Sequence, residues 1–465
     1  MDLRIFPRKI VCLSGIAMIM LSCRKEDKII PDPLPTGPVT RLETSKWILD
    51  SMRYYYLWNT ALPEKADTQL AAIPYFNTLK QPADTFSQII DLNDIPGTSK
   101  KDFLHTFGFD FTVVSVNGIE RPLGLLKFVI PGSAAWQDGL RRGDYFTKIN
   151  NTPLTPQNTA GLSEDLLDNH QGTLTKADII NNTVSETREI PLQGATLQEN
   201  PLYSYQTFSN QGHPTGYIFY NYFDDFYNNA LLDAFTKLKQ DGIKELIIDL
   251  RYNPGGSVAA AAALITLIAP ATNENSILAR YTGNGKLGTQ SITFGQALAV
   301  PESKVVIPFS KLATGRSAIS RVFILTTPQT ASAAELVINN LKPYIQVITI
   351  GERTYGKDKG AVVITDMRSP RRLSWALAPI TYLLSNAKGE GNYTSGIAPD
   401  YTVYELNTQP LLPMGDPADP FIAKALAVIR GDGRTTNYPA ERTTIPIYDT
   451  RAKASRESRL ILPRR

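Results

Sequence analysis

Residues 243–256 read IKELIIDLRYNPGG, an almost unbroken apolar run that ends in a pair of glycines. Apolar runs of this kind are typical of strands that are buried on both faces of a parallel sheet. The alanine-rich stretch from Val258 to Ala269 follows directly and is predicted to form a buried helix. A buried strand, a tight turn and a helix in this order indicate an α/β layered core.

The same alternation of strands and helices extends on both sides of this stretch. Upstream, GYIFYNYF from Gly216 is predicted to be a strand, and DDFYNNALLDAFTKLKQ after it a helix. Downstream, Lys304–Phe309 and Arg321–Thr326 are predicted to be further strands. We therefore expect the α/β core to span residues 199–430.

A second buried strand leads into a serine at the start of a helix. Residues 322–336 read VFILTTPQTASAAEL, so Ser332 follows a strand and a tight turn. The unpaired N–H groups and the dipole at a helix N-terminus favour developing negative charge, and the small alanines around Ser332 leave room for a substrate. These features are compatible with a nucleophile at Ser332. Taken alone, the segment favours the alternative that Ser332 only caps the helix, which is the common role of serine there.

A third segment contains a lysine, and the glycine pair offers open backbone N–H groups. Residues 347–357 read VITIGERTYGK and place Lys357 after a strand and a glycine, 25 residues after Ser332. The adjacent Gly255 and Gly256 leave backbone N–H groups unobstructed, which is what an oxyanion site requires.

Together the three segments resemble the tail-specific, or C-terminal processing, serine proteases, which share a "DLR.N.GG" turn, a "TASA.E" turn and a "GE.T.GK" lysine. The resemblance implies that Ser332 is the nucleophile and Lys357 the general base. It also implies that the N–H groups of Ala333 and of either Gly255 or Gly256 form the oxyanion hole. The fold that it implies is a ClpP/crotonase-like α/β core, and neither a metal nor an organic cofactor is required.

Two features of the lysine segment complicate this assignment. Many members of the family carry a glutamine four residues after the lysine, where this chain has Ala361, and Lys359 is an alternative base. Free lysine has a pKa near 10.4, so a lysine base must lose roughly 3 pKa units through burial. Lys357 is therefore expected to be buried beside Ser332, with the carboxylates of Asp358 and Glu352 directed away from it.

Residues 107–198 are predicted to form a mostly β, PDZ-like domain upstream of the core. An Asn-Gly pair at 117–118 between apolar runs is a hairpin signal, and PGSAAWQDGLRRGDYFTKINNTPL from Pro131 resembles the PDZ pattern. A PDZ module binds a peptide as an added strand and holds its terminal carboxylate with backbone N–H groups. Phe107, Gly108 and Phe109 are the candidate carboxylate loop. An ordinary hairpin start is the alternative, because the charge of Asp110 opposes a carboxylate.

The N-terminal part indicates an exported protein with a lipid anchor. Residues 1–23 combine a basic start with an apolar run too short to span a bilayer, and they end in a lipobox-like Met-Leu-Ser-Cys in which Cys23 would be lipidated. Residues 24–43 are predicted to be a proline-containing linker and residues 44–106 a small helical domain. This region resembles that of Bacteroidetes-type lipoprotein members, which implies an outer-membrane lipoprotein facing the periplasm or the cell surface.

Composition excludes several other classes of protein. The chain has 465 residues, enough for about three domains, and a net charge of +4. The net charge of +4 is accounted for by the basic tail, residues 431–465, which has eight basic and four acidic residues, and not by a folded surface, which disfavours nucleic-acid binding. Both cysteines, Cys12 and Cys23, lie in the leader, so neither a cysteine nucleophile nor a cysteine-ligated zinc site is expected. A metal site has no supporting pattern.

These observations predict an exported serine endopeptidase with a Ser-Lys dyad. Its substrates would be proteins or peptides recognised by their C-terminal region through the PDZ-like domain. The competing hypothesis is a surface lipoprotein that binds peptides without cleaving them and keeps a degenerate protease core. An esterase or amidase acting on other substrates is a third alternative.

Overall fold

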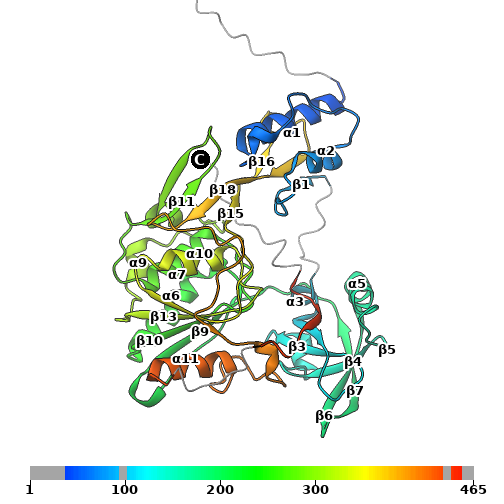
Figure 1. Cartoon of the computed structure of the whole chain (residues 1–465), viewed down its shortest axis with the longest axis vertical. Helices are drawn as coiled ribbons and strands as arrows, with labels where there is room; N and C mark the ends of the chain where they lie inside the picture. The colour runs from blue at the N-terminus through cyan, green and yellow to red at the C-terminus, as the bar shows by residue number, and fades with distance from the viewer. Residues whose placement is uncertain (1–36, 94–101, 433–440, 453–465) are drawn as a thin grey trace, which may run out of the picture. The chain divides into compact units, whose positions relative to one another are not determined.

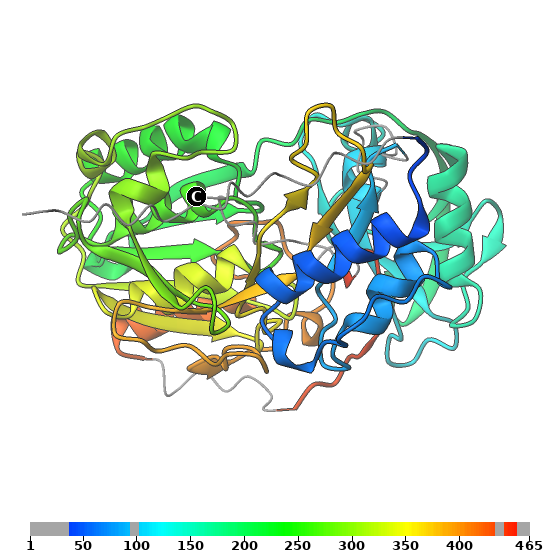
Figure 2. The ribbon, with the colours of Figure 1, turned by 90° about the horizontal axis from the view of Figure 1, so that it is seen from above.

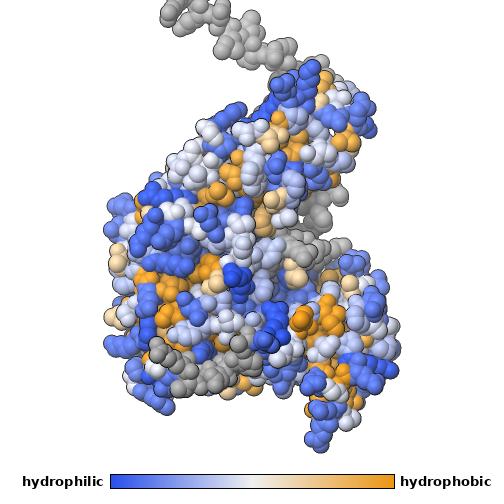
Figure 3. Space-filling model, viewed as in Figure 1, coloured by the Kyte–Doolittle hydropathy of each residue, from blue (hydrophilic) through white to orange (hydrophobic). Residues whose placement is uncertain are grey.

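The computed structural model describes residues 37–93, 102–432 and 441–452 (Figure 1). Contacts divide the chain into residues 1–39 and residues 40–465, and the helices and strands of the described residues lie in the second part. The predicted leader, with Cys23, lies outside the described residues. Within the described residues, no helix is both long enough and apolar enough to cross a bilayer. On the face shown in Figure 3, apolar residues form separate small groups between hydrophilic ones.

The α/β core is built on a six-stranded sheet with the order β19-β14-β13-β10-β9-β8. Its strands are β8 (Leu202–Phe208), β9 (Thr215–Tyr220), β10 (Glu245–Asp249), β13 (Arg321–Thr326), β14 (Gln346–Gly351) and β19 (Tyr401–Thr402). Neighbouring strands pair in parallel except at the β8–β9 edge. The central strands are fully buried because helices cover both faces. The prediction of an α/β core is confirmed.

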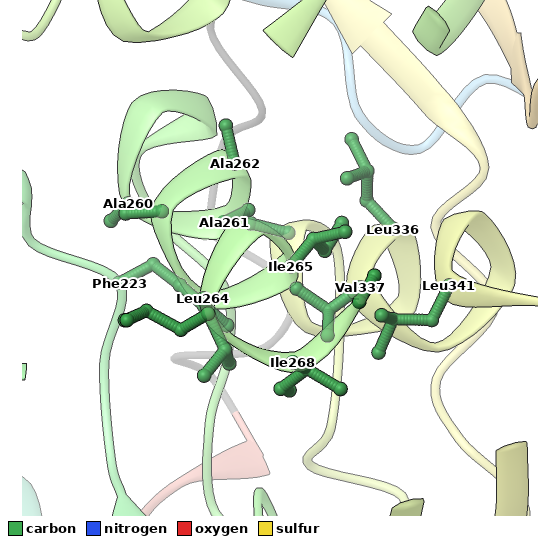
Figure 4. Packing of buried hydrophobic residues seen from close by; sticks show 14 of the residues in the cluster. Phe223, Ala260, Ala261, Ala262, Leu264, Ile265, Ile268, Leu336, Val337 and Leu341 are labelled. Atoms are coloured by element: carbon green, nitrogen blue, oxygen red, sulfur yellow. The ribbon is translucent and has the colours of Figure 1, made fainter. Parts of the chain in front are cut away.

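The two faces of the sheet carry alternate residues of the same strands. Ile248 and Ile324 pack with helices α6 (Asn228–Gln240), α7 (Val258–Ile268) and α10 (Ala333–Leu341), whereas Ile247 and Phe323 pack with α11 (Pro420–Arg430). This follows from the two-residue period of a strand. Figure 4 shows side chains of α7 and α10 meeting between the two helices, with Ile265 directed toward Val337.

Shorter elements complete the core. They are α8 (Phe294–Leu298), α9 (Phe309–Ala313) and the 3₁₀ helices Asn210–Gly212, Asp225–Tyr227 and Glu405–Asn407. A four-stranded sheet has the order β12-β11-β18-β15 and consists of β11 (Ile277–Thr282), β12 (Thr289–Thr293), β15 (Lys359–Ala361) and β18 (Ile380–Ser385). The predicted strand at Lys304–Phe309 is wrong: this segment has no regular structure before α9 begins at Phe309. Apolar composition alone misleads here, since Val306 is exposed and Pro308 lacks an N–H for pairing.

The N-terminal region is helical, as expected, but it depends on strands from the core. Its helices are α1 (Arg41–Tyr55), α2 (Ala72–Leu79) and a 3₁₀ turn at Asn59–Ala61. They pack beside a three-stranded sheet of β1 (Gln88–Asp91), β17 (Trp375–Ala378) and β16 (Ile364–Thr365). Figures 1 and 2 both show the helices beside these strands. Two of the three strands therefore lie more than 250 residues further along the chain.

Residues 103–193 contain a mostly antiparallel β-sheet with three short helices, here called the β-domain. It contains α3 (Phe103–Phe107), β2 (Phe109–Val114), β3 (Leu123–Val129), α4 (Ala134–Gln137), β4 (Tyr145–Ile149), β5 (Thr152–Pro153), α5 (Thr159–Asn169), β6 (Gln171–Ile180) and β7 (Thr183–Gln193). The predicted hairpin is present, with β2 and β3 antiparallel on either side of Gly118 at φ +81°. The sheet has an added edge strand, β20 (Pro446–Asp449), from the C-terminal end of the described chain.

A histidine joins the β-domain to the start of the core. The His105 ring lies between two carboxylates, with Nδ1 2.8 Å from Asp102 Oδ1 and Nε2 3.2 Å from Glu199 Oε2. Burial lowers the pKa of His105, but hydrogen bonds to Asp102 and Glu199 outweigh burial and raise this pKa to about 9. The protonated ring therefore stabilises the fold fully below about pH 6.5, and this stabilisation is lost as pH rises through about 9.

We expect the free energy of unfolding to fall as pH rises from about 6 to about 10. This fall should be larger in the wild-type chain than in His105→Gln, by up to about 3 kcal/mol. Urea unfolding curves at the two pH values measure this difference. His213→Gln is the matched control, since the His213 ring takes part in no ion pair among the described residues. Parallel pH dependence of wild type and His105→Gln would contradict the prediction.

Candidate active site

Ser332 stands at the junction between the turn after β13 and helix α10. Its backbone has φ +58° and ψ −116°, a region that residues other than glycine rarely adopt. The residue is 0% exposed, and its Oγ has no hydrogen-bond partner among the described residues. A buried hydroxyl without a partner is costly in a purely structural role. Ser332 occupies the N-cap position of α10 and the Glu335 carboxylate accepts its N–H, but the hydroxyl itself makes no cap hydrogen bond.

The turn before Ser332 is fastened to the turn that carries the glycine pair. Thr330 donates its hydroxyl to Leu250 O at 2.8 Å, and Ala331 N–H donates to Asn253 O at 3.0 Å. The Thr327 hydroxyl donates to the carbonyl of Arg251. These bonds hold two sequence segments 80 residues apart in one arrangement.

The glycine pair lies directly against the serine. Both residues have positive φ, +108° at Gly255 and +132° at Gly256. A Cβ on Gly255 would lie 2.7 Å from Ser332 Cβ and 2.9 Å from Ala333 N, so no other residue fits there. The Gly255 N–H already donates to Asn253 Oδ1 at 2.8 Å. No described residue accepts a hydrogen bond from the N–H of Gly256.

Glu335, in the first turn of α10, connects the serine to the lysine segment. Its Oε2 accepts the backbone N–H groups of Ser332 at 3.0 Å and of Lys357 at 2.8 Å. Its Oε1 accepts the N–H of Gly356 at 2.7 Å and the hydroxyl of Thr354 at 2.5 Å. Burial raises the pKa of Glu335, and these four donors oppose that rise. One carboxylate therefore positions the backbones of both predicted catalytic residues.

Lys357 is buried, as the sequence predicts, but its Nζ makes no hydrogen bond to the Ser332 hydroxyl, which has no partner among the described residues. The residue is 3% exposed, and its Nζ lies 5.1 Å from the centre of the Phe86 ring, which comes from the N-terminal region. The two carboxylates expected to point away from it have other partners. Asp358 accepts hydrogen bonds from Lys359 Nζ at 2.6 Å and from the Thr394 hydroxyl at 2.6 Å, and Glu352 is paired with Arg442.

The alternative base, Lys359, is in a different environment. Its Nζ forms an ion pair with Asp358 and a hydrogen bond to the Thr394 hydroxyl at 3.2 Å. The Lys359 amine is therefore already held by two partners of its own, Asp358 and Thr394. The position of the missing glutamine, Ala361, lies in β15 and is nearly buried. These contacts favour Lys357 over Lys359.

The predicted carboxylate loop lies where α3 ends and β2 begins. Gly108 is the C-cap of α3 at φ +86°, and its N–H donates to the carbonyls of Phe103 and Leu104. The side chains of Phe107 and Phe109 are buried in the apolar centre of the β-domain. The role of these three residues in peptide binding stays a prediction.

Sequence analysis missed several residues of the site. Glu335 follows Ser332 by three residues, the spacing of a carboxylate that reaches back to the N-cap N–H, and this pattern could have identified it. Asn253 and Phe86 carry no such pattern. Among the described residues, no cluster of histidine, cysteine, aspartate and glutamate has the arrangement of a metal site.

Comparison with known proteins relates the chain to one family. Residues 214–403 match the family model described as Peptidase family S41, and residues 43–88 match the Peptidase S41 N-terminal domain. Together the two matches span about half of the chain.

Individual relatives agree with this match. The carboxy-terminal processing protease CtpA of Bacillus subtilis is 27% identical over 271 residues, which is 57% of this chain and 52% of that protein. The chloroplastic carboxyl-terminal-processing peptidase 1 of Arabidopsis thaliana is 23% identical over 60% of this chain and 53% of that protein. The chain thus spans about half the length of the curated relatives that it matches. A crystal structure assigned to the S41 proteases, from Bacteroides fragilis, superposes with a TM-score of 0.66 at 25% identity, covering 87% of this chain and all of that one.

Proposed function

Because the chain belongs to peptidase family S41, we propose that it is an exported serine endopeptidase that uses a Ser332–Lys357 dyad. The observation that carries this proposal is the buried Ser332 hydroxyl, which has no partner among the described residues. Through Glu335, the backbone of this serine is held next to that of a buried lysine. We propose further that the β-domain is PDZ-like and receives the C-terminal region of protein substrates.

In the proposed reaction, Lys357 Nζ takes the proton of the Ser332 hydroxyl as Oγ bonds to the carbonyl carbon of the substrate. The carbonyl electron pair moves to oxygen, and the N–H groups of Ala333 and Gly256 stabilise this oxyanion. Gly256 is preferred over Gly255 because the Gly255 N–H is engaged by Asn253. The C–N bond then breaks, and the leaving amine takes the proton from Lys357.

Water completes the cycle by attacking the resulting ester. Lys357 removes a proton from this water as its oxygen bonds to the acyl carbon, and the returning proton restores the Ser332 hydroxyl as the acid product leaves. Every proton is accounted for by the serine, the lysine, the water and the substrate. The residues of this chain are sufficient for each step.

A serine-reactive probe tests this proposal directly. We expect a fluorophosphonate to label the chain lacking residues 1–23, with the added mass on the peptide that contains Ser332, because only an activated hydroxyl reacts. The same protein should convert denatured casein to peptides. Absence of labelling and of cleavage in a folded chain would favour the alternative, a peptide-binding lipoprotein with a degenerate core.

The role of Glu335 can be separated from that of the dyad. All four groups around its carboxylate donate to it, so the amide NH2 of Glu335→Gln, which can only donate, would face donors instead of acceptors. Loss of positioning should lower kcat roughly 10- to 100-fold and leave KM nearly unchanged. Steady-state cleavage of a quenched fluorescent peptide measures both constants.

The matched control for this variant is Glu245→Gln. Glu245 forms an ion pair with Arg321 at the opposite end of strand β10 from the Gly255 turn, so kcat should be unchanged. An equal loss of kcat in both variants, or a loss confined to KM, would show that Glu335 has no positioning role.

A further inference from the structure

The C-terminal segment Pro446–Arg451 lies along the free edge of the β-domain. Strand β20 pairs antiparallel with β2, with Thr112 opposite Asp449 and Val113 opposite Tyr448. The Thr450 N–H extends the ladder by donating to Phe111 O at 3.1 Å. The basic tail, for which the sequence suggests no role, thus contributes an added strand.

The segment also contacts the helix that faces this edge. The ring of Tyr448 lies 5.8 Å from that of Phe111 on β2. Ile447 and Tyr448 pack against the apolar centre of the β-domain, which includes Leu166 of α5. The segment therefore fills a groove between β2 and α5, in the manner of a peptide bound by strand addition.

The direction of the segment is also that of a bound peptide. As β20 runs from residue 446 to residue 449, it passes from Val114 toward Thr112, so its C-terminal end approaches the start of β2. At that end the groove presents a carboxylate. Asp110 is 3% exposed, accepts the Thr450 hydroxyl at 2.9 Å and forms an ion pair with Arg451.

Arg451 is held as a specific ligand at this end of the groove. The residue is 5% exposed, and its Nη1 donates to Asn221 Oδ1 at 2.9 Å and to Tyr252 O at 2.6 Å. A free peptide carboxylate at the same place would face the like charge of Asp110 without water to screen it. The groove is therefore suited to an internal arginine.

The same segment reaches the turns of the candidate active site. Arg451 bonds the carbonyl of Tyr252, three residues before Gly255. The carboxylate of Asp449 accepts Gln329 Nε2, three residues before Ser332, at 2.8 Å and Lys127 Nζ at 2.8 Å. A cavity of about 260 Å³ lies between the segment and the serine turn.

We propose that the groove between β2 and α5 is a binding site for an extended polypeptide segment with a tyrosine followed three residues later by an arginine, and that the chain's own Pro446–Arg451 occupies it. An incoming protein must displace this segment to bind there. The inference rests on the peptide-recognition part of the proposed function and not on the Ser332 chemistry, so its test is done without catalysis.

The test uses the Ser332→Ala chain lacking residues 1–23 and a fluorescein-labelled peptide of sequence TTIPIYDTRAK, residues 443–453. Arg451→Glu places a like charge against Asp110 and should release the segment in cis. Fluorescence anisotropy should then show at least about tenfold tighter peptide binding than in the chain with Arg451 intact. Glu441→Lys, an exposed charge reversal five residues before this segment, should leave binding as in the intact chain.

Two matched peptides define what the groove recognises. Alanine in place of the peptide's arginine should weaken binding to Arg451→Glu at least about tenfold, because Asp110 then lacks its partner. A peptide ending at the arginine should bind equally well as the free acid and as the amide. Preference for the free acid would overturn the proposal, as would the absence of peptide binding in Arg451→Glu.

A second variant and a second measurement guard against misfolding of Arg451→Glu. Thr450→Pro removes the N–H that donates to Phe111 O and the hydroxyl that reaches Asp110, and it leaves the buried charges in place. It should also bind the peptide more tightly than the intact chain. In the intact chain the Thr450 amide should exchange its hydrogen slowly, and rapid exchange there would show that the segment does not occupy the groove.

Discussion

Replacing Ser332 by alanine, or Lys357 by alanine or arginine, is expected to reduce peptide-bond cleavage by roughly 10³-fold or more. Ser332→Ala removes the atom that bonds to the substrate. Lys357→Ala removes the group that takes the serine proton. Lys357→Arg keeps a positive charge on a side chain of similar length, but the guanidinium cannot lose its proton near neutral pH. This variant therefore distinguishes a lysine that acts as a base from a lysine whose positive charge only stabilises its surroundings.

Lys359→Arg is the matched control for the lysine substitutions. Lys359 is two residues away and also buried, yet it is already ion-paired with Asp358, which arginine can also pair with. This variant should keep most of the activity. Initial rates with a quenched fluorescent peptide, at equal concentrations of folded protein, measure the series.

Two outcomes would contradict the assignment. Activity in Ser332→Ala would mean that another nucleophile is used. Loss of activity in Lys359→Arg together with activity in Lys357→Arg would transfer the role of base to Lys359. If all variants behave as expected, the double variant Ser332→Ala/Lys357→Ala should be no less active than either single variant, because the two groups act as one unit.

The local sequence pattern predicted the segments that are built on buried strands. The boundaries of β13, Arg321–Thr326, follow from apolar residues flanked by polar ones, and the position of Ser332 after that strand follows with them. The burial of Lys357 was also anticipated, and it is confirmed. In these segments the two-sided packing of a parallel sheet leaves little choice of structure.

Features that depend on distant partners could not be predicted in this way. Strand β20 forms only because β2 offers an open edge more than 330 residues earlier in the chain. The contact between the Phe86 ring and Lys357 could not be predicted either, because nothing in the sequence around Phe86 indicates it. The sequence suggested that Asp110 is ill-suited to a carboxylate loop. Its ion pair with Arg451 explains why a carboxylate lies at this position.

Arg251→Met is expected to lower the free energy of unfolding by about 3–5 kcal/mol, the range for breaking a fully buried ion pair by removal of one partner. The Arg251 side chain is 0% exposed. Its Nη1 lies 2.8 Å from Asp419 Oδ2 and 3.0 Å from Glu405 Oε1, and its Nη2 lies 2.8 Å from Asp249 Oδ2. Methionine fills a similar volume but leaves three buried carboxylates behind.

Only one other guanidinium, that of Arg142, reaches this cluster among the described residues. It contacts Glu405 at 2.8 Å and Asp419 at 3.8 Å, so Asp249 is the carboxylate left without a cation. Burial raises the pKa of Glu405, but Arg142, Arg251 and Lys127 outweigh burial and hold this pKa at about 2. Stability from Glu405 is therefore present above about pH 4.5 and is lost as pH falls toward 2.

Because the stability contributed by Glu405 depends on pH, the prediction for Arg251→Met can also be tested by varying pH. The difference in unfolding free energy between wild type and Arg251→Met should be largest near neutral pH and should shrink below about pH 4.5, where the carboxyls can be neutral. Arg321→Met is the matched control, because the Arg321–Glu245 pair is partly exposed and should be worth less than about 1 kcal/mol. Urea unfolding curves of the three proteins at several pH values measure both effects.

The result also shows what role Arg251 plays between the end of β10 and the glycine turn. Asp419 caps α11, and Glu405 belongs to the segment before it, so Arg251 joins the end of β10 to two elements far along the chain. A loss of stability with normal labelling of Ser332 in the folded fraction would identify Arg251 as a residue that holds the site together. A stable Arg251→Met that fails to label would instead place Arg251 in the reaction itself.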